Sequence, residues 1–596
     1  MATLTENQQV LKGGAFIIQN SLAEETYTPA DITEEQAMFR DSCREFVDKR
    51  VLPQVDAIDN KGYSIVVGLL EEAGELGLLG ATLPEAYGGM GVNFNTETLL
   101  SEEIGKSYSF GVAVAAHTGI GTLPVLYFGT EAQKAKYLPG MASGKLKASY
   151  CLTEPGSGSD ALAAKTRADL NAEGTHYLLN GQKMWITNSG FADLFIVFAK
   201  IDGDKFTGFI VDGGTPGITL GAEEDKMGIK GSSTRQVFFE NAAVPVENVL
   251  GDIGQGHKIA FNVLNIGRYK LCAMVTGGSK AACTAAIRYA NERYQFGVPI
   301  ASFGAMRHKM AEMACRIYAS ESATFRTSGL INQMISALEE TGKPRYLAKL
   351  EAAEEYSIEC AMLKVFGSEV LDYVVDEAVQ IYGGMGFSEE SPVARAYRDA
   401  RINRIFEGTN EINRLLSVGM LLKKATKGQL NLLGAATAVQ QELMGMPDMS
   451  SPEGILGVEK RTVEHAKKAV LMVAGAAAQK FMAKLDKEQE IMMNLADMLM
   501  EVYVCESTVL RTEKLIMAKG EAACSDQIDM TRVYLEEASY RIHQAGKSAI
   551  CGFAEGDMLR MMLLGLKRYT KTEPYNTIAS RRRIADRLTE ANHYCY

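Results

Sequence analysis

The sequence changes character between residues 149 and 256. Short runs rich in aromatic and β-branched residues occur there, separated by glycine and proline: 177–180, 194–200, 206–212 and 236–240. Such spacing predicts a small antiparallel β domain. No G-x-G-x-x-G follows one of these runs at the start of a helix, so a dinucleotide-binding βαβ unit is not predicted. We therefore expect an α+β protein, mainly α, in which a small β domain interrupts helical regions.

Helical patterns fill the sequence on both sides of this region. Residues 33–36 (TEEQ) predict a helix cap with an acidic first turn, and Ala- and Met-rich segments at 281–292 and 303–326 are typical of core helices. Apolar positions three and four apart continue at 481–500 and 530–544. A chain of 596 residues exceeds one hydrophobic core. We expect an N-terminal arm at 1–32, a helical domain at 33–148, the β domain at 149–256, a helical bundle at 257–425 and a helical extension at 426–596.

The composition disfavours several classes of protein. The formal net charge is −11, whereas nucleic-acid-binding proteins normally carry a basic face. Ten cysteines and seven histidines are scattered without zinc-site spacing, so we expect reduced thiols and no metal site. The first residues lack the pattern of a signal or transit peptide, and no run of about 18 apolar residues occurs. We expect a cytoplasmic protein without a transmembrane helix.

One octapeptide contains the strongest candidate for chemistry. In residues 404–411 (RIFEGTNE) a single carboxylate, Glu407, stands between apolar residues and a glycine. A carboxylate held against apolar surface is poorly solvated, so its pKa rises toward neutrality and it becomes a usable base. Gly408 lets a ligand or another backbone come close. The same residues are also typical of a helix start, with Thr409 as its cap and Glu411 in its first turn.

A second motif lies upstream at 149–160 (SYCLTEPGSGSD). Pro155, Gly156 and Gly158 exclude a regular helix there. The run offers hydroxyl and free backbone N–H groups on a tight turn, which suits an anionic or polar ligand. A Ser- and Gly-rich loop without a ligand would have the same composition. Farther along, residues 183–188 (KMWITN) contain the only tryptophan of the chain.

Two more segments complete a pattern: 292–297 (ERYQFG) and 380–387 (QIYGGMGF). Together and in this order, the motifs resemble the acyl-CoA dehydrogenase family over roughly residues 35–420. The length beyond residue 420 resembles the very-long-chain branch, whose members have a C-terminal extension of similar size. The resemblance implies a fold in which helices enclose a small β domain, and FAD as the cofactor.

The resemblance also implies an activity, the conversion of a long-chain acyl-CoA to its trans-2-enoyl-CoA in fatty acid β-oxidation. Glu407 would remove the α-proton while a hydride passes to flavin N5. The thioester oxygen would be held by a flavin ribityl hydroxyl and the backbone N–H of Glu407. Some relatives place the base on a helix, immediately before an arginine that corresponds to Arg268. Here that position is Gly267, which cannot act as a base, so the resemblance keeps the base at Glu407.

The same resemblance assigns residues to the cofactor and the substrate. The cofactor side is implied to involve Tyr150, Leu152, Thr153, Gly158, Ser159, Trp185, Ile186, Thr187, Arg293, Phe296, Gln380, Gly383, Gly384, Thr409 and Glu411. The substrate side is implied to involve Ser159, Asn265, Arg268 and Gly408. Within the first set, Arg293 and Phe296 would bind the FAD of the neighbouring subunit, and Gln380, Gly383 and Gly384 would line its pyrophosphate and adenosine.

Partners follow from the resemblance as well: an acyl-CoA substrate, an electron-transfer flavoprotein as acceptor and a second copy of the chain in a homodimer, with no nucleic acid. Small residues at 116–121 leave room for a long acyl chain, although a flexible helix end would have the same composition. The apolar segment 431–446 favours packing over membrane contact, because it lacks the basic polar face of an interfacial helix. Two alternatives stay open: an acyl-CoA oxidase on the same scaffold, and a non-catalytic relative that binds DNA or assists assembly.

Overall fold

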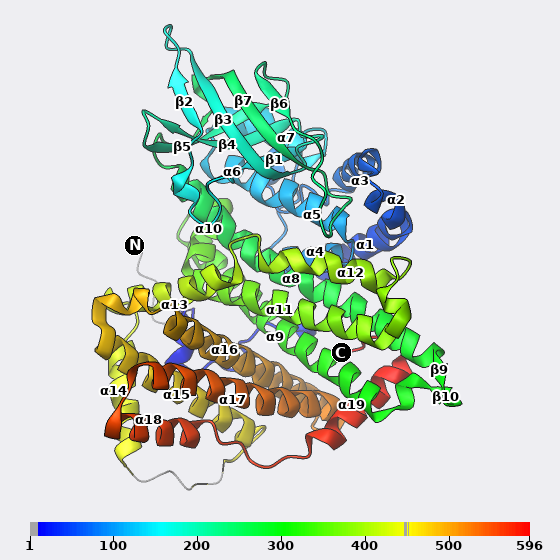
Figure 1. Ribbon diagram of the computed structural model, residues 1–596, viewed down its shortest axis with the longest axis vertical. Helices are drawn as coiled ribbons and strands as arrows, with labels where there is room; N and C mark the ends of the chain where they lie inside the picture. The colour runs from blue at the N-terminus through cyan, green and yellow to red at the C-terminus, as the bar shows by residue number, and fades with distance from the viewer. Residues whose placement is uncertain (1–9, 446–449, 451) are drawn as a thin grey trace.

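The computed structural model describes residues 10–445, 450 and 452–596. In Figure 1 the β domain lies at the top, the long helices of a central bundle lie in the middle, and the helices of the C-terminal extension lie at the bottom. The mainly helical α+β fold predicted from the sequence is confirmed. The predicted N-terminal arm begins with residues 1–9, which lie outside the described residues.

The N-terminal helices are short and lie beside the β domain and the upper side of the bundle (Figure 1). They are α1 Glu34–Phe46, α2 Val55–Asp59, α3 Tyr63–Glu75, α4 Phe94–Ile104, α5 Ser109–Ala115, α6 Thr122–Phe128 and α7 Glu131–Ala142. Thr33 caps α1 as predicted, because its side chain accepts from the Gln36 N–H and the Gln36 side chain accepts from the Thr33 N–H. A short π-helix, Ala116–Gly121, joins α5 to α6.

One stretch of this N-terminal region, Ser109–Phe128, is long and apolar enough to span a membrane by composition alone. In its most apolar window, 78% is buried inside the protein. Burial of that extent is what a core helix shows, and one such stretch is weak evidence for a membrane span.

The β domain is a single sheet. Its strands are β1 Ala148–Cys151, β2 Arg167–Leu170, β3 His176–Thr187, β4 Leu194–Ile201, β5 Lys205–Asp212, β6 Ile218–Leu220, β7 Thr234–Pro245 and β8 Val249–Leu250. The order is β6-β7-β3-β2-β4-β5-β8, and β1 also pairs with β4. Most pairs are antiparallel, as predicted, but β1 and β2 both run parallel to β4.

The two parallel pairs explain how the sheet presents the 149–160 motif. β1 pairs with the first half of β4, and β2 pairs with its last two residues. The opposite side of β4 is taken along its whole length by β5. β1 and β2 therefore lie end to end along one side of β4, and residues 152–166 loop out of this line of strands.

The central bundle is built from long helices that run across the middle of Figure 1. Its elements are α8 Gly256–Glu292, β9 Tyr294–Gln295, β10 Val298–Pro299, α9 Gly304–Glu340, α10 Arg345–Glu355, α11 Ser357–Tyr382, α12 Pro392–Ala400 and α13 Asn410–Thr426. α8 packs along α11, and α9 packs against both. The segments expected to be core helices, 281–292 and 303–326, lie within α8 and α9, which extend well beyond them.

The extension is also helical, and its helices pack beneath the bundle (Figure 1). They are α14 Leu432–Met444, α15 Gly457–Phe481, α16 Gln489–Lys519, α17 Ser525–Phe553, α18 Gly556–Tyr569 and α19 Thr577–Ala591. The apolar pattern at 481–500 is interrupted, because a 3₁₀ turn at Met482–Lys487 separates α15 from α16. α16 packs against α9 and α13, which joins the extension to the bundle.

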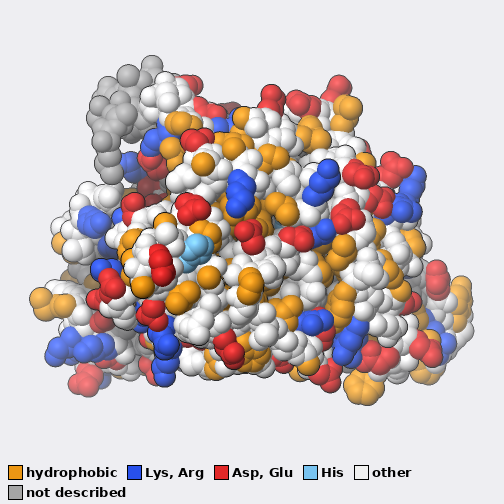
Figure 2. All heavy atoms as spheres, turned by 90° about the horizontal axis from the view of Figure 1, so that it is seen from above, with side chains coloured by type: hydrophobic (Ala, Val, Ile, Leu, Met, Phe, Trp, Pro, Cys, Tyr) orange, Lys and Arg blue, Asp and Glu red, His pale blue; other side chains and the backbone are white. Residues whose placement is uncertain are grey.

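The face of the molecule on the β-domain side is drawn in Figure 2. Acidic and basic side chains are interspersed over this face, with apolar side chains between them. No broad basic area covers this view, whereas a nucleic-acid-binding face normally clusters Lys and Arg.

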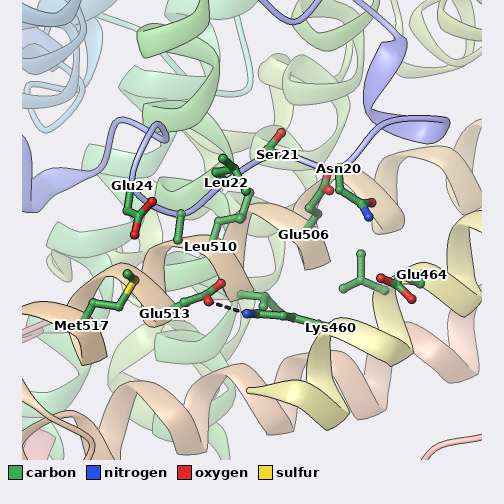
Figure 3. A pocket seen from close by; sticks show the side chains of 13 residues that line it. Asn20, Ser21, Leu22, Glu24, Lys460, Glu464, Glu506, Leu510, Glu513 and Met517 are labelled. Carbon is green, nitrogen blue, oxygen red and sulfur yellow. Dashed lines mark hydrogen bonds and ion pairs between the residues drawn. The ribbon is translucent and has the colours of Figure 1, made fainter. Parts of the chain in front are cut away.

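The arm crosses from the bundle to the extension. Phe16 is fully buried, and its ring lies 4.8 Å from that of Tyr503 on α16. Residues 20–24 then border a cavity of about 280 Å³ between the arm, α15 and α16 (Figure 3). Lys514 on α16 fixes the end of the arm through Asp31 at 2.8 Å.

Candidate active site

The octapeptide forms the turn between the 3₁₀ segment Arg401–Arg404 and helix α13. Glu407 and Gly408 both have positive φ, at 60° and 78°. Left-handed backbone at a residue other than glycine is strained, and such strain clusters at functional sites. Thr409 caps α13 by accepting from a backbone N–H, and Glu411 lies in the first turn. Both interpretations of the motif therefore hold: it starts a helix, and its strained turn presents Glu407.

The carboxylate of Glu407 faces Gly267 on α8. A Cβ atom placed on Gly267 would lie 2.8 Å from Glu407 Oε2. The Glu407 residue is partly accessible, but its Oε2 atom is buried and has no hydrogen-bond partner among the described residues. Burial raises the pKa of Glu407 to about 7, although the charges of Arg268 and Lys364 act to lower it. The carboxylate thus occupies the space that a side chain at position 267 would take.

Arg268 and Asn265 lie on α8 and contact the same turn. Arg268 Nη1 donates to Asn265 Oδ1 at 2.9 Å, and its Nε donates to the Glu407 carbonyl at 3.3 Å. Arg268 is buried, and burial lowers its pKa. The structure therefore brings three predicted substrate-side residues, Asn265, Arg268 and Gly408, close to Glu407.

Two further residues of this site were missed in the sequence. Lys364 on α11 donates to the Gly408 carbonyl and to Asn410 Oδ1, both at 2.8 Å. Asn413 on α13 donates from Nδ2 to the carbonyls of Glu407 and Gly408 at 3.2 and 2.8 Å. Asn413 lies two positions after the octapeptide, so a longer motif would have included it. Nothing in the local sequence distinguishes Lys364 from other helix lysines.

The β domain contributes Tyr150 from β1. Its hydroxyl is buried and has no hydrogen-bond partner in the described part of the chain. Burial, and then the charge of Glu407, raises the pKa of Tyr150 well above its ordinary value. Tyr150 therefore places a second buried polar atom, unpartnered in the described part of the chain, near Glu407.

The 149–160 motif and β3 are fastened together. The Met184 N–H donates to the Thr153 carbonyl at 3.0 Å. Lys183 is completely buried and pairs with Glu154 at 2.7 Å, and its Nζ also donates to the Leu152 carbonyl at 3.2 Å. The beginning of the motif is thus held against the strand that carries the tryptophan. Beyond it, Gly158 and Ser159 are exposed.

Trp185 lies at a bulge in β3. The register shifts between Lys183 and Ile186, and Trp185 has a φ of 60°. Its side chain is 53% exposed, whereas the Ile186 side chain is buried in the core of the β domain. Bulges re-aim side chains and are common next to active sites. Trp185 is therefore free to contact a ligand, but Ile186 can do so only through its backbone. The Thr187 carbonyl accepts from Ser149 Oγ at 2.8 Å.

The remaining predicted cofactor residues lie at the far end of the bundle. Arg293 follows the end of α8, about 37 Å along the helix axis from Arg268. Phe296, in the hairpin β9–β10, is 93% exposed with a φ of 54°. Tyr289 of α8 stacks on Tyr382 of α11 with ring centroids 4.0 Å apart, so this end also holds the predicted set Gln380, Gly383 and Gly384. Within one chain, these residues are separate from Glu407.

The cavities that border the arm lie away from Glu407. The first, of about 280 Å³, is lined by several carboxylates, among them Glu24, Glu464 and Glu506 (Figure 3). The second, of about 490 Å³, is bounded by the arm, α9 and the segment 429–431. The acidic lining of the first cavity does not suit an anionic substrate. Over the described ranges, no group of three or more His, Cys, Asp or Glu side chains is placed to hold a metal ion.

Comparison with protein families agrees with this geometry. Residues 33–145 match the acyl-CoA dehydrogenase N-terminal domain, 149–242 the middle domain and 254–420 the C-terminal domain. A further model, also described as an acyl-CoA dehydrogenase C-terminal domain, matches residues 465–568. Both the core and the extension are thus matched by models of one family.

Individual relatives extend over most of the chain. A probable acyl-CoA dehydrogenase of Bacillus subtilis is 50% identical over 98% of both chains. The human very long-chain specific acyl-CoA dehydrogenase is 35% identical over 87% of this chain and 80% of its own length. The crystal structure of a Bacillus anthracis acyl-CoA dehydrogenase complexed with FAD has a TM-score of 0.96 at 49% identity, covering 98% of this chain and all of the other. The protein therefore belongs to the acyl-CoA dehydrogenase family, a family of oxidoreductases.

Proposed function

We propose that this protein is an FAD-dependent dehydrogenase that converts a long-chain acyl-CoA to the trans-2-enoyl-CoA in fatty acid β-oxidation. The observation that carries the proposal is the Glu407 carboxylate, whose Oε2 atom is buried and unpartnered among the described residues and which is held by a strained turn. Burial raises the pKa of Glu407 to about 7, and a base is most effective when its pKa lies near the working pH.

The residues present fit FAD, the cofactor named for the Bacillus anthracis relative. Trp185 offers an exposed aromatic side chain at a bulge, and Thr153 and Thr187 lie on adjoining segments of the same domain. On the bundle side, Thr409 and Glu411 stand at the start of α13 beside the base. These residues would hold the cofactor, which supplies the acceptor for the hydride.

The chain itself would supply the proton acceptor and the orientation of the substrate. Glu407 would take the α-proton through Oε2, the oxygen without a partner among the described residues. Arg268 and Asn413 donate to the Glu407 carbonyl, which fixes the strained turn. The backbone N–H of Glu407 would stabilise negative charge on the thioester oxygen, and this polarisation would acidify the α-carbon.

A second copy of the chain would complete the cofactor site. Arg293 and Phe296 lie at the far end of α8, and Phe296 is 93% exposed although its ring meets that of Phe303 edge to face, with ring centroids 6.0 Å apart. Gly383 and Gly384 occur at the same end of the bundle. In a homodimer this end of one subunit would reach the FAD of the other.

The small residues of the π-helix Ala116–Gly121, between α5 and α6, would leave room for a long acyl chain. A Cβ atom on Gly119 would meet nothing within 4 Å, so open space adjoins Gly119, whereas a Cβ atom on Gly121 would lie 2.7 Å from Ala148 Cβ. The similarity to a very long-chain enzyme supports the same preference. Comparing butyryl-CoA with palmitoyl-CoA as substrates would test it.

The first experiment is an anaerobic visible spectrum of the purified protein before and after addition of palmitoyl-CoA. Bleaching of the flavin bands in the wild type and their persistence in Glu407→Gln would support the reaction and its base. A colourless protein that takes up no FAD would overturn the proposal.

Two measurements separate the alternatives. Rapid reoxidation of the reduced protein by oxygen would indicate an acyl-CoA oxidase, whereas slow reoxidation and fast transfer to an electron-transfer flavoprotein would support the dehydrogenase. Salt-dependent retention on DNA would revive a nucleic-acid role. The net charge of −11 and the mixed charges of the face in Figure 2 disfavour that role.

A further inference from the structure

Lys364 is a completely buried lysine directly behind the catalytic turn. Its Nζ donates to the Gly408 carbonyl and to Asn410 Oδ1, both at 2.8 Å. Both acceptors follow Glu407 within three residues. Lys364 comes from α11, in the middle of the bundle, so its position is fixed by a packed helix and not by the turn itself.

Its hydrogen bonds act on the strained part of the turn. The carbonyl of Gly408 accepts from Lys364 and also from Asn413 Nδ2 at 2.8 Å. In a trans peptide the C=O and the following N–H point in opposite directions. Holding the Gly408 carbonyl on the α11 side therefore turns the Thr409 N–H away from α11. A turn with two successive positive φ values needs such restraints, because the flanking residues alone would relax it.

No ion pair among the described residues accounts for the buried charge of Lys364. Within the described residues, no carboxylate oxygen lies close enough to its Nζ to form one. Burial lowers the pKa of Lys364 to about 8, and the negative charge of Glu407 opposes this shift. If only two hydrogen bonds were needed, a neutral donor would serve without the cost of burying a charge.

The other charged groups around Glu407 come from separate elements. Arg268 of α8 is positive and directs its Nε to the Glu407 carbonyl. Glu369 of α11 is bound by Arg414 and Asn410, and Glu411 stands on α13. The remaining titratable group is Tyr150 of β1, whose raised pKa keeps it neutral. Lys364 is thus one of two cations that face the base.

We propose that Lys364 is a positioning residue for the base: its ammonium group holds the turn that presents Glu407 and supplies the positive charge that keeps Glu407 ionisable at neutral pH. This inference rests on the proposed function. It predicts that charge and geometry can be separated, because arginine would retain the charge, glutamine would retain a hydrogen-bond donor, and methionine would retain neither.

The test measures the rate of anaerobic flavin reduction by palmitoyl-CoA from about pH 5 to about pH 9 in the holoenzyme. Removing a nearby positive charge raises a carboxylate pKa. In Lys364→Met and Lys364→Gln we therefore expect the pH midpoint of the rate to rise by about one unit, and the rate at pH 7 to fall about fivefold. Lys364→Arg should keep the wild-type midpoint while its rate falls, because its geometry differs.

Lys467→Met is the matched control, since Lys467 is a buried lysine of the extension paired with Glu506. Its midpoint should equal that of the wild type. The inference is overturned if both neutral variants keep the wild-type midpoint, or if both lose flavin while Lys467→Met retains it, which would mark a structural role. If the wild type itself is not bleached, the proposed function fails instead.

Discussion

Buried charges are paired differently at the turn that presents Glu407 and at the junction between the bundle and the extension. At the junction, Glu506 of α16 pairs with Arg326 of α9 at 2.8 Å and with Lys467 of α15 at 2.6 Å. Arg511 of α16 likewise pairs with Glu321 of α9 at 2.7 Å. At the turn, Glu407 and Lys364 have no ion pair among the described residues.

The difference separates an architectural use of charge from a chemical one. Each junction charge meets an opposite charge in direct contact, which offsets the desolvation penalty and fixes one helix against another. At Glu407 the same penalty is only partly offset, by Arg268 and Lys364 without a direct ion pair, so burial raises its pKa to about 7. Perturbed groups of this kind are typical of functional sites. Removing a charge should therefore abolish chemistry in one region and destabilise the fold in the other.

Glu407→Gln tests the chemical side and should give the largest effect. Glutamine keeps the size of the side chain but cannot accept the α-proton. Flavin reduction by palmitoyl-CoA should fall at least about 10³-fold, at the upper part of the range for loss of a catalytic base. Stopped-flow absorbance under anaerobic conditions measures the rate. The thermal midpoint should not fall, because no ion pair is lost, and a variant that keeps a tenth of the wild-type rate would refute Glu407 as the base.

Glu506→Gln tests the architectural side. It leaves Arg326 and Lys467 buried without their shared carboxylate. Breaking a buried pair in this way costs about 3 to 5 kcal/mol of the free energy of unfolding. Urea denaturation measures the loss, with Glu590→Gln as the control. Glu590 is exposed and pairs only with Arg587 among the described residues, so its loss should cost less than about 1 kcal/mol. Equal losses in both variants would contradict the comparison.

Local sequence was sufficient to predict structural features that depend on one short segment of the chain. The octapeptide contains the proposed base, the strained turn and the helix cap. The turn and the cap depend on neighbours one to four residues away, whereas the burial that raises the pKa of Glu407 depends on α8. The four β-rich runs fall within β3, β4, β5 and β7, although β3 and β7 extend well beyond them and β1, β2, β6 and β8 were not predicted as runs. The bulge at Trp185 was not predicted, because a bulge depends on the register with β7.

Contacts between distant segments could not be read from the sequence. Lys364 reaches Gly408 across 44 residues, and its role becomes visible only when α11 packs behind the turn. The parallel pairing of β1 and β2 with β4 is likewise a tertiary feature, since the alternation of each strand is the same in either direction. The partners of Glu506 lie on two other helices, and no sequence motif connects them with Glu506.

Gly267→Ala sharpens the comparison by disturbing the base without removing it. The added Cβ would lie 2.8 Å from Glu407 Oε2, so the carboxylate must move. A shift of this size at a reacting group should slow flavin reduction about 10- to 100-fold. Stability should change little, because the contact is with the end of a flexible side chain. Gly419→Ala is the control: it lies in α13, its Cβ would meet nothing within 4 Å, and it should leave the rate unchanged.

The smallest effect is a pH dependence of stability that has opposite signs in the two regions. Burial raises the pKa of Glu407 to about 7, so the folded state keeps a proton that the unfolded state loses near its ordinary pKa of 4.5. Stability should therefore fall as the pH rises from about 4.5 to about 7, by at most about 1.4 kcal/mol per pH unit. Glu321 at the junction has a lowered pKa, held down by Lys280 and Arg511 against the effect of burial. The contribution of Glu321 to stability is present above about pH 4.5 and is lost as the pH falls below it.

Urea denaturation of Glu407→Gln and of the wild type across about pH 4 to 8 measures the contribution of Glu407. Between about pH 4.5 and 7 the variant should become more stable relative to the wild type, and above about pH 7 the difference between them should stay constant. A difference that does not depend on pH would mean that Glu407 is solvated and is not poised as a base.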